Sequence, residues 1–424
     1  MGSVMGEAPT SIEPGPLNHS ELARVGLWVE FVRVGSFFYL FTSLVAVLGV
    51  FAGHEFVRLS NHPLAKRGDV ISAFAAWDGE WYVRIVSEGY SYHPNRASSV
   101  AFFPAYPGLG WLVGRLTGLP PDRALLIVSH VCLAGAFVLT AAYVRRRFRH
   151  APQQLTAYVL LATGFFPTTF FFRMAYSESL FLLVAVLALY GMEQKWPLLV
   201  IALVVGLATA ARPVGLGLVA PLVSYLWHRS ASLKGFVGRV ALLIPLACWG
   251  IAAYALYQFL AFGEPLAFAH SQMQWRLRHP VPLDDKVFAL ETLEPVRSVF
   301  DPSSPGYWAR HAPQDNPWLN LQLANPVFFL LTVTLIAAGA YRRWLSSYEL
   351  AFASCTLFIP YVTRGYEMCM ASTGRFAAVV FPVYLVLGHL LLRMPAPLAA
   401  ALLAGSGLML GAYAAMFASW HEFI

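Results

Sequence analysis

Long, unbroken apolar segments are the feature of this sequence that most restricts its fold. Many of them are close to the roughly 20 residues that an α-helix needs to cross a lipid bilayer. Peptide groups inside lipid find hydrogen-bond partners only in helices or closed barrels, and these segments lack the alternating pattern of barrel strands. Since 58% of the 424 residues are hydrophobic and only 12% are charged, the sequence predicts an all-α polytopic membrane protein.

The apolar segments predict about eleven membrane crossings. They lie near residues 34–57, 122–144, 154–172, 175–192, 196–211, 214–228, 238–262, 323–341, 347–363, 376–392 and 395–418. Residues 104–118 are apolar but short and bracketed by prolines, so they form either a span or a helix at the interface. Residues 1–33 lack the pattern of a cleaved signal peptide and are expected to be a cytoplasmic tail. Residues 34–424 would then form one transmembrane domain.

The positions of Lys and Arg predict the orientation, because basic residues favour the cytoplasmic side. If residues 104–118 do not cross, Arg145–Arg149 and the later basic clusters fall inside together with the N-terminus. If they do cross, nearly all of these clusters fall outside, so we expect the first topology. Two long loops, about 58–121 and 263–322, then lie on the extracytoplasmic side. The net charge of +7 is explained by these clusters, and we expect no nucleic-acid partner.

Neither a metal site nor a disulfide framework is indicated by the sequence. The four cysteines fall mostly within apolar segments and lack CxxC or His spacing, and the first loop contains no DxD pair. We therefore expect no required metal and no cofactor. Asp284 and Asp285 in the second loop fit the start of a helix better than a set of ligands.

The first loop places charged residues where a membrane surface is expected. Within it, Asp78 is either the N-cap of a short helix over 79–88 or a carboxylate with a chemical role. Glu80 is either half of an i,i+4 ion pair with Arg84 or a further site residue. The residues alone leave both interpretations open.

Further charged residues fall on the same predicted side of the membrane. They are Arg173 and Glu178 with Ser177 in FPTTFFFRMAYSESLF, Arg212 in ATAARPVG, Arg364 and Arg375 in TRGYEMCMASTGRF, and His270 in the second loop. Charges at membrane depth usually face a cavity, although the first segment could be a solvated loop tip and Arg212 could snorkel to the interface. Guanidinium groups match phosphate oxygens well. The set predicts a site where a carboxylate takes a proton from a hydroxyl while arginines hold a departing phosphate.

The motifs WDGEWYVRIVSEGY, FFPAYP, YSESLF and ATAARPVG occur in this order between about residues 70 and 220. Together they resemble the PIG-V family, the second mannosyltransferase of GPI-anchor synthesis, and its bacterial relatives. The C-terminal half matches mainly through the Arg375–Phe376 pair. The resemblance implies the GT-C glycosyltransferase fold, with helices in the extracytoplasmic loops and Asp78 as catalytic base. It also implies a polyprenyl-phosphate mannose donor, inversion at the sugar, and Arg212, Arg364 or Arg375 at the donor phosphate.

The resemblance further implies that Glu178 orients the acceptor or an arginine. Other residues expected to shape the site or bind substrate are Trp77, Glu80, Tyr82, Phe103, Pro104, Tyr106, Arg173, Ser177 and His270. The compact chain looks like a prokaryotic relative in a bacterial inner membrane. The acceptor is therefore open: a phosphatidylinositol mannoside, another glycolipid or a protein.

Two other classes of protein fit this composition. A transporter or lipid flippase also needs buried charges and many helices, but the sequence shows no paired halves with broken helices in corresponding places. A non-catalytic subunit of a glycosyltransferase complex would keep the fold without needing Asp78. We expect a membrane enzyme whose partners are the donor, a glycolipid acceptor and membrane lipids.

Overall fold

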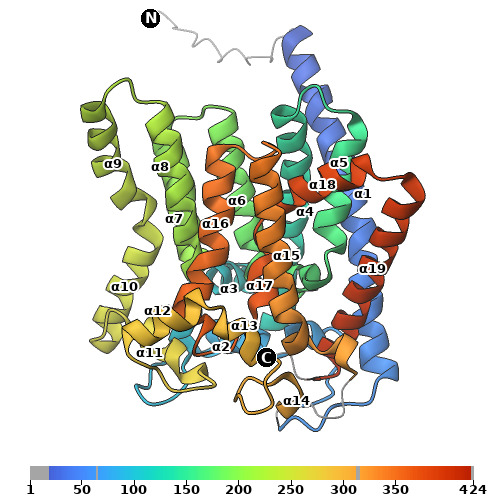
Figure 1. The fold of residues 1–424 in the computed structure, drawn as a ribbon, viewed down its shortest axis with the longest axis vertical. Helices are drawn as coiled ribbons and strands as arrows, with labels where there is room; N and C mark the ends of the chain where they lie inside the picture. Colours follow the sequence, from blue (N-terminus) through green and yellow to red (C-terminus); the bar gives the residue numbers. More distant parts are fainter. Residues whose placement is uncertain (1–18, 64, 312–315, 422–424) are drawn as a thin grey trace, which may run out of the picture.

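The computed structural model describes residues 19–63, 65–311 and 316–421, and no strand occurs within them. The prediction of an all-α protein is therefore confirmed for this part of the chain. Residues 1–18 of the expected tail lie outside the described residues, while residues 19–33 form the start of helix α1 (His19–Phe56). Figure 1 shows most of the long helices running side by side, with α1 packed along α19 (Ala396–Ala418) at one edge.

Among the described residues, four helices are long and apolar enough to cross a membrane. They are residues 25–56 of α1, α4 (Pro121–Arg147), α15 (Leu321–Tyr341) and α19. Two bent pairs raise the number to six if each pair is one span. These pairs are α5 (Gln153–Phe165) with η3 (Pro167–Arg173), bent by 79°, and α9 (Leu233–Ala247) with α10 (Trp249–Phe262), bent by 49°. The chain is thus an integral membrane protein by its apolar helices, but the predicted count of eleven crossings is not confirmed.

Shorter helices complete the bundle. They are α6 (Glu178–Glu193), α7 (Leu198–Ala211), η4 (Pro213–Leu218), α8 (Val219–His228), α16 (Ser347–Pro360), α17 (Thr373–Ala378) and α18 (Pro382–Arg393). Helix α6 lies in the middle of the bundle, packs against α4 and α7, and is buried along nearly its whole length. Its first residue, Glu178, is therefore carried into the interior, where an ionised carboxylate is stable only if it is paired.

The two predicted long loops contribute a layer of short helices at one end of the bundle (Figure 1). The first loop forms η1 (Ser72–Ala75), α2 (Asp78–Glu88), η2 (Ser99–Ala101) and α3 (Ala105–Thr117). The second forms α11 (Ala267–Gln272), η5 (Met273–Trp275), α12 (Leu283–Glu291), α13 (Glu294–Ser298), α14 (Trp308–His311) and η6 (Pro317–Leu319). Asp284 and Asp285 stand in the first turn of α12, as the sequence predicts.

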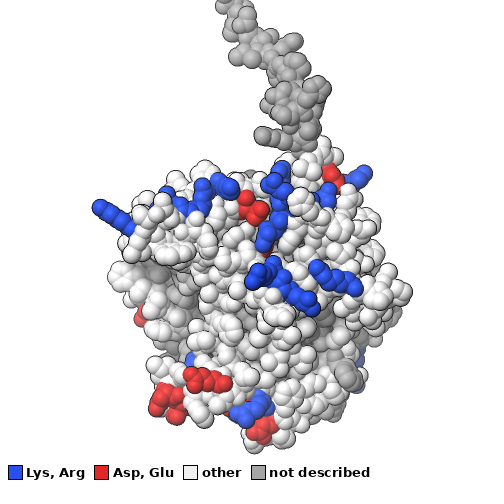
Figure 2. All heavy atoms as spheres, turned by 45° about the horizontal axis from the view of Figure 1, so that its top comes forward, with Lys and Arg blue, Asp and Glu red and all other residues white. Residues whose placement is uncertain are grey.

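Basic side chains gather at the other end of the molecule, where α1 starts (Figure 2). Both predicted loops therefore lie at one end and the basic surface at the opposite one. Helix α3 has 13 residues and is about 20 Å long, which is too short to cross 30 Å of hydrocarbon as a straight helix. These observations agree with the topology in which residues 104–118 do not cross, and the side of the membrane that each end faces stays a prediction.

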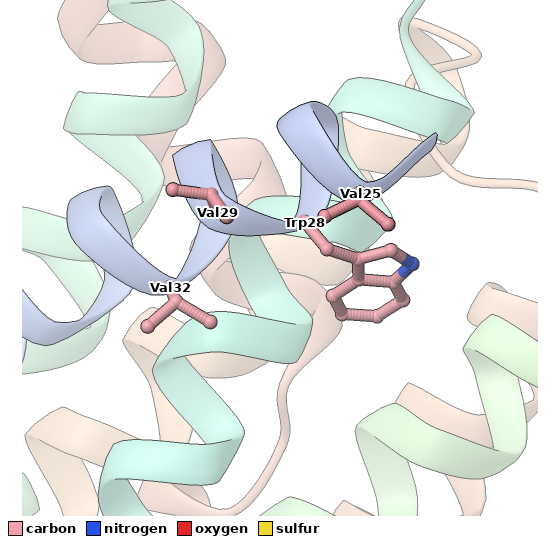
Figure 3. Close-up of a pocket in the computed structure, with 4 residues that line it drawn as sticks. All are labelled: Val25, Trp28, Val29 and Val32. Carbon is pink, nitrogen blue, oxygen red and sulfur yellow. The ribbon is translucent and has the colours of Figure 1, made fainter. Parts of the chain in front are cut away.

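A pocket at the start of α1 is purely apolar (Figure 3). It is lined by Val25, Trp28, Val29 and Val32. None of these four side chains titrates or ionises, so the pocket offers no group that could carry out chemistry. The groups that could carry out chemistry are the charged residues at the opposite end of the bundle.

Candidate functional site

Asp78 is the first residue of α2 and does not act as its N-cap. The N-cap position belongs to Trp77, whose backbone φ of 61° and ψ of −123° lie in a region that costs a non-glycine residue about 1–3 kcal/mol. The Asp78 N–H donates a hydrogen bond to the hydroxyl of Tyr176 (3.0 Å), and that hydroxyl donates to the carbonyl of Ala76 (3.2 Å). The interpretation of Asp78 as a helix cap is therefore wrong, and its carboxylate faces other partners.

Arg375 joins two carboxylates that are distant in the sequence. Its Nη1 lies 2.5 Å from Oδ2 of Asp78, and its Nε donates to Oε1 of Glu178. Arg212 pairs through Nη1 with the same Oε1 of Glu178. Glu178 is fully buried, whereas the Asp78 side chain is 35% exposed. The four side chains form what we call the charge cluster, which runs from the protein interior at Glu178 to the surface at Asp78.

The guanidinium groups of this cluster are held by aromatic rings. That of Arg375 lies 4.6 Å from the ring centre of Tyr176 and 5.6 Å from that of Phe171. Those of Arg212 and Arg364 lie 5.9 Å and 5.7 Å from the ring centre of Phe376. Because both contact the same ring, Arg364 lies beside the charge cluster.

Arg364 differs from the other two arginines in having no ion-pair partner among the described residues. It belongs to the π-helical turn Tyr361–Gly365 that follows α16. Burial lowers the pKa of its guanidinium to about 10; Asp78 opposes this shift, and the charges of Arg375 and Arg212 add to it. Arg364 thus stays protonated at neutral pH. Three guanidinium groups face two carboxylates, and the excess positive charge favours an anion at this site.

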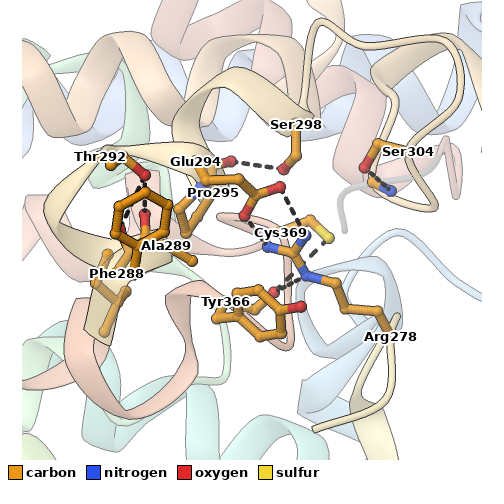
Figure 4. A network of polar contacts seen from close by, with 12 residues as sticks. Arg278, Phe288, Ala289, Thr292, Glu294, Pro295, Ser298, Ser304, Tyr366 and Cys369 are labelled. Atoms are coloured by element: carbon orange, nitrogen blue, oxygen red, sulfur yellow. Dashed lines mark hydrogen bonds and ion pairs between the residues drawn. The ribbon is translucent and has the colours of Figure 1, made fainter. Parts of the chain in front are cut away.

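A second network holds the segment that carries Arg364 and Arg375 (Figure 4). Arg278 of the second loop donates two hydrogen bonds to Glu294 (2.8 and 2.7 Å), and its guanidinium lies 3.7 Å from the ring centre of Tyr366. Next to it, Lys286 Nζ lies 2.7 Å from Oε1 of Glu367. The second loop is therefore fastened to the segment between Arg364 and Arg375.

Several of the predicted site residues contribute packing contacts. Tyr82 is buried, donates to Ser177 Oγ (2.9 Å) and packs its ring against Tyr106 (4.9 Å between ring centres). Burial, and to a smaller extent the charge of Glu178, raises the pKa of Tyr82 to about 12, so it stays protonated. Phe103 packs against Tyr254 (5.1 Å between ring centres), and Pro104 precedes α3. The Tyr82–Tyr106 contact thus packs α2 against α3, and the Phe103–Tyr254 contact packs the start of α3 against α10.

Other predicted residues have their contacts elsewhere. Arg173 is fully buried against α1, where it donates to Thr42 Oγ1 (2.9 Å) and Ser43 Oγ (3.2 Å). His270 is 55% exposed, with Glu264 3.8 Å away. The i,i+4 spacing predicts an ion pair between Glu80 and Arg84. In the structure Glu80 pairs with Lys66 instead (2.5 Å).

Sequence reasoning missed two aromatic residues of the site. Tyr176 contacts both the Asp78 backbone and the Arg375 guanidinium, and the Phe376 ring contacts both Arg212 and Arg364. Tyr176 stands inside the YSESLF motif, and Phe376 follows Arg375 directly. The motifs contained both residues, but an aromatic residue next to a charge does not by itself indicate a contact.

Comparison with known proteins bears on the first half of the chain. Residues 65–233 match the model of the family described as Mannosyltransferase (PIG-V). Over 208 residues the chain is 30% identical to GPI alpha-1,6-mannosyltransferase 2 of Homo sapiens, covering 47% of this chain and 40% of that protein. The protein of the same name from Rattus norvegicus is 28% identical over 219 residues, 46% of this chain and 42% of the rat protein. No solved structure matches the chain significantly.

The match covers less than half of the length of these relatives. It includes Asp78, Glu178 and Arg212, whereas Arg364 and Arg375 lie beyond residues 65–233. The order of the motifs and the comparisons agree on one family. Residues 65–233 are thus similar to the PIG-V mannosyltransferase family.

Proposed function

We propose that this protein is a membrane mannosyltransferase of the GT-C class. It moves a mannosyl residue from a polyprenyl-phosphate carrier to a hydroxyl of a glycolipid, on the extracytoplasmic side of a bacterial inner membrane. One observation carries the proposal: the half-exposed carboxylate of Asp78 sits at the edge of a charge cluster with an excess of positive charge. A base and an anion site are thus available side by side.

Asp78 is the proposed general base. Arg375 binds Oδ2 of Asp78, while Oδ1 has no hydrogen-bond partner among the described residues. The acceptor hydroxyl would donate its proton to Oδ1 as its oxygen bonds to the anomeric carbon of the sugar. The bond from that carbon to the phosphate oxygen breaks on the opposite face. A single displacement of this kind inverts the configuration at the sugar.

The arginines are the proposed site of the leaving phosphate. The departing polyprenyl phosphate gains negative charge as the glycosidic bond breaks, and preorganised donors stabilise that charge without reorganising. Arg364 is the strongest candidate because its guanidinium has no counter-ion in the described part of the chain. Arg375 and Arg212 add positive potential while they hold Glu178.

The direct test is transfer of labelled mannose from polyprenyl-phosphate mannose to lipids of the source organism, with purified protein in lipid nanodiscs. We expect Asp78→Asn to lower turnover by about 10²–10⁴-fold with little change in donor affinity, because only the proton acceptor is lost. Asp69→Asn is the matched control, since Asp69 is an exposed carboxylate of the same loop that contacts Ser72 and Arg123. Turnover by Asp78→Asn at the wild-type rate would remove Asp78 as the base. A wild-type protein that binds no donor would favour a transporter.

A further inference from the structure

An aromatic corner lies beside Asp78 and is not used by the chemistry above. Trp81 follows Asp78 by three positions on α2, so the two side chains are neighbours on the helix surface. The Trp81 ring stacks on Phe102 (5.8 Å between ring centres, 19° between planes) and meets Trp275 at 73° (5.8 Å). Phe102 is buried, whereas Trp81 and Trp275 are half-buried. We call these three residues the aromatic corner.

Hydrogen bonds on either side of Trp275 connect it to the first loop and to the segment that carries Arg364. Just before it, Gln272 Nε2 donates to the carbonyl of Ala101 in the first loop (3.1 Å). Just after it, the N–H of Leu277 donates to the carbonyl of Glu367, on the segment that carries Arg364 (2.8 Å). The corner is therefore held between the helix of the proposed base and the segment of the proposed phosphate site.

The chemistry of the corner suits a sugar ring. A pyranose has faces of C–H groups, which pack on aromatic rings, and an edge of hydroxyls that needs polar partners. Arg84 is exposed and carries its guanidinium 5.2 Å from the Trp81 ring centre, where its N–H donors can reach such hydroxyls. Two tryptophans and an arginine on half-exposed loops thus offer both kinds of contact.

We infer that the aromatic corner is a carbohydrate subsite that receives a pyranose ring next to Asp78. The inference rests on the proposed function and deepens it. The ring is either the mannosyl group of the donor or a sugar of the glycolipid acceptor. Each source predicts a different ligand whose affinity depends on Trp81 and Trp275.

Equilibrium binding to protein in nanodiscs separates the sources with two pairs of ligands. One pair is polyprenyl-phosphate mannose and bare polyprenyl phosphate; the other is phosphatidylinositol mannoside and phosphatidylinositol. We expect Trp81→Ala and Trp275→Ala to weaken the mannose-bearing member of one pair about three- to tenfold and to leave the bare member unchanged. The affected pair identifies the sugar that the corner receives.

Trp111→Ala is the matched control. Trp111 is 53% exposed on α3 and also has an arginine near its ring, Arg115 at 5.9 Å. Its replacement should leave all four affinities unchanged, and Trp81→Phe and Trp275→Phe should retain most of the mannose-dependent affinity. These conservative variants keep the test valid if an alanine variant fails to fold.

The inference is overturned if the alanine variants weaken mannose-bearing and bare ligands equally or not at all. It is also overturned if the wild type prefers the mannose-bearing member in neither pair. Failure of the transferase proposal looks different. In that case the wild type transfers no mannose, while a mannose-dependent loss of affinity in the tryptophan variants still supports the subsite.

Discussion

Arg375 Nη1 lies 2.5 Å from Oδ2 of Asp78, across a separation of 297 positions in the sequence. This contact joins α17 to α2 of the first predicted loop. Because the same guanidinium also holds the buried Glu178, the orientation of Asp78 depends on how the C-terminal third of the bundle packs.

Arg375→Ala should destabilise the protein, because it removes one of the two cations that pair with the buried Glu178. Breaking a buried ion pair on one side typically costs about 3–5 kcal/mol. Arg375→Lys keeps the positive charge but lacks the planar guanidinium with its several N–H donors, so the loss of stability should be smaller. Heating followed by size-exclusion chromatography would rank the variants. Arg96→Ala, at an exposed arginine of the first loop, is the control, and an Arg375→Ala protein as stable as this control would contradict the prediction.

Arg364→Ala should weaken donor binding without destabilising the fold. Its guanidinium has no ion-pair partner among the described residues, and removing it relieves repulsion with Arg375 and Arg212. Hydrogen bonds to charged groups contribute about 1.5–3 kcal/mol, so we expect donor affinity to fall about 10- to 100-fold. Binding of polyprenyl-phosphate mannose and thermal stability would be measured on the same sample. Unchanged affinity would move the phosphate site to Arg212 or Arg375.

Arg278 and Glu294 should behave as one unit in their effect on donor affinity. Their two hydrogen bonds lie within the second loop and orient the Arg278 guanidinium, which packs over the ring of Tyr366, two positions after Arg364. We expect Arg278→Ala and Glu294→Ala each to lower donor affinity, and the double variant to lose little more than either single one. A double-mutant cycle measures this coupling, which reaches about 0.5–3 kcal/mol for residues in contact. Additive losses would show that the pair does not position the segment.

His270→Ala should leave turnover and donor affinity at the wild-type level. Sequence reasoning placed His270 among the site residues, but its side chain is 55% exposed and its neighbour is Glu264. A mannose-transfer assay run beside Asp78→Asn would test this. Loss of activity in the His270 variant would mean that the second loop reaches the charge cluster during the reaction.

The predicted crossings illustrate the limit of apolar patterns. Hydropathy identified residues 154–172 and 238–262 as spans, yet in the structure the first bends by 79° between α5 and η3 and the second by 49° between α9 and α10. A hydropathy window averages over such breaks, because a bend changes the direction of the chain and not its composition. The predicted helix start at Asp284 and Asp285 was confirmed, because the preference of acidic residues for the first turn of a helix depends only on residues close in the sequence.

By itself the sequence determined the helical class and the two loops, because peptide groups in lipid can satisfy their hydrogen bonds in few ways. It also determined the motifs that carry Asp78, Glu178 and Arg212, because each motif is a short run of adjacent residues. Only the tertiary structure decided which charges meet. It paired Asp78 with Arg375 and Glu178 with both Arg375 and Arg212, left Arg364 without an ion-pair partner among the described residues, and placed Arg173 against α1. Contacts between residues up to 297 positions apart depend on the packing of every helix between them, which no local pattern encodes.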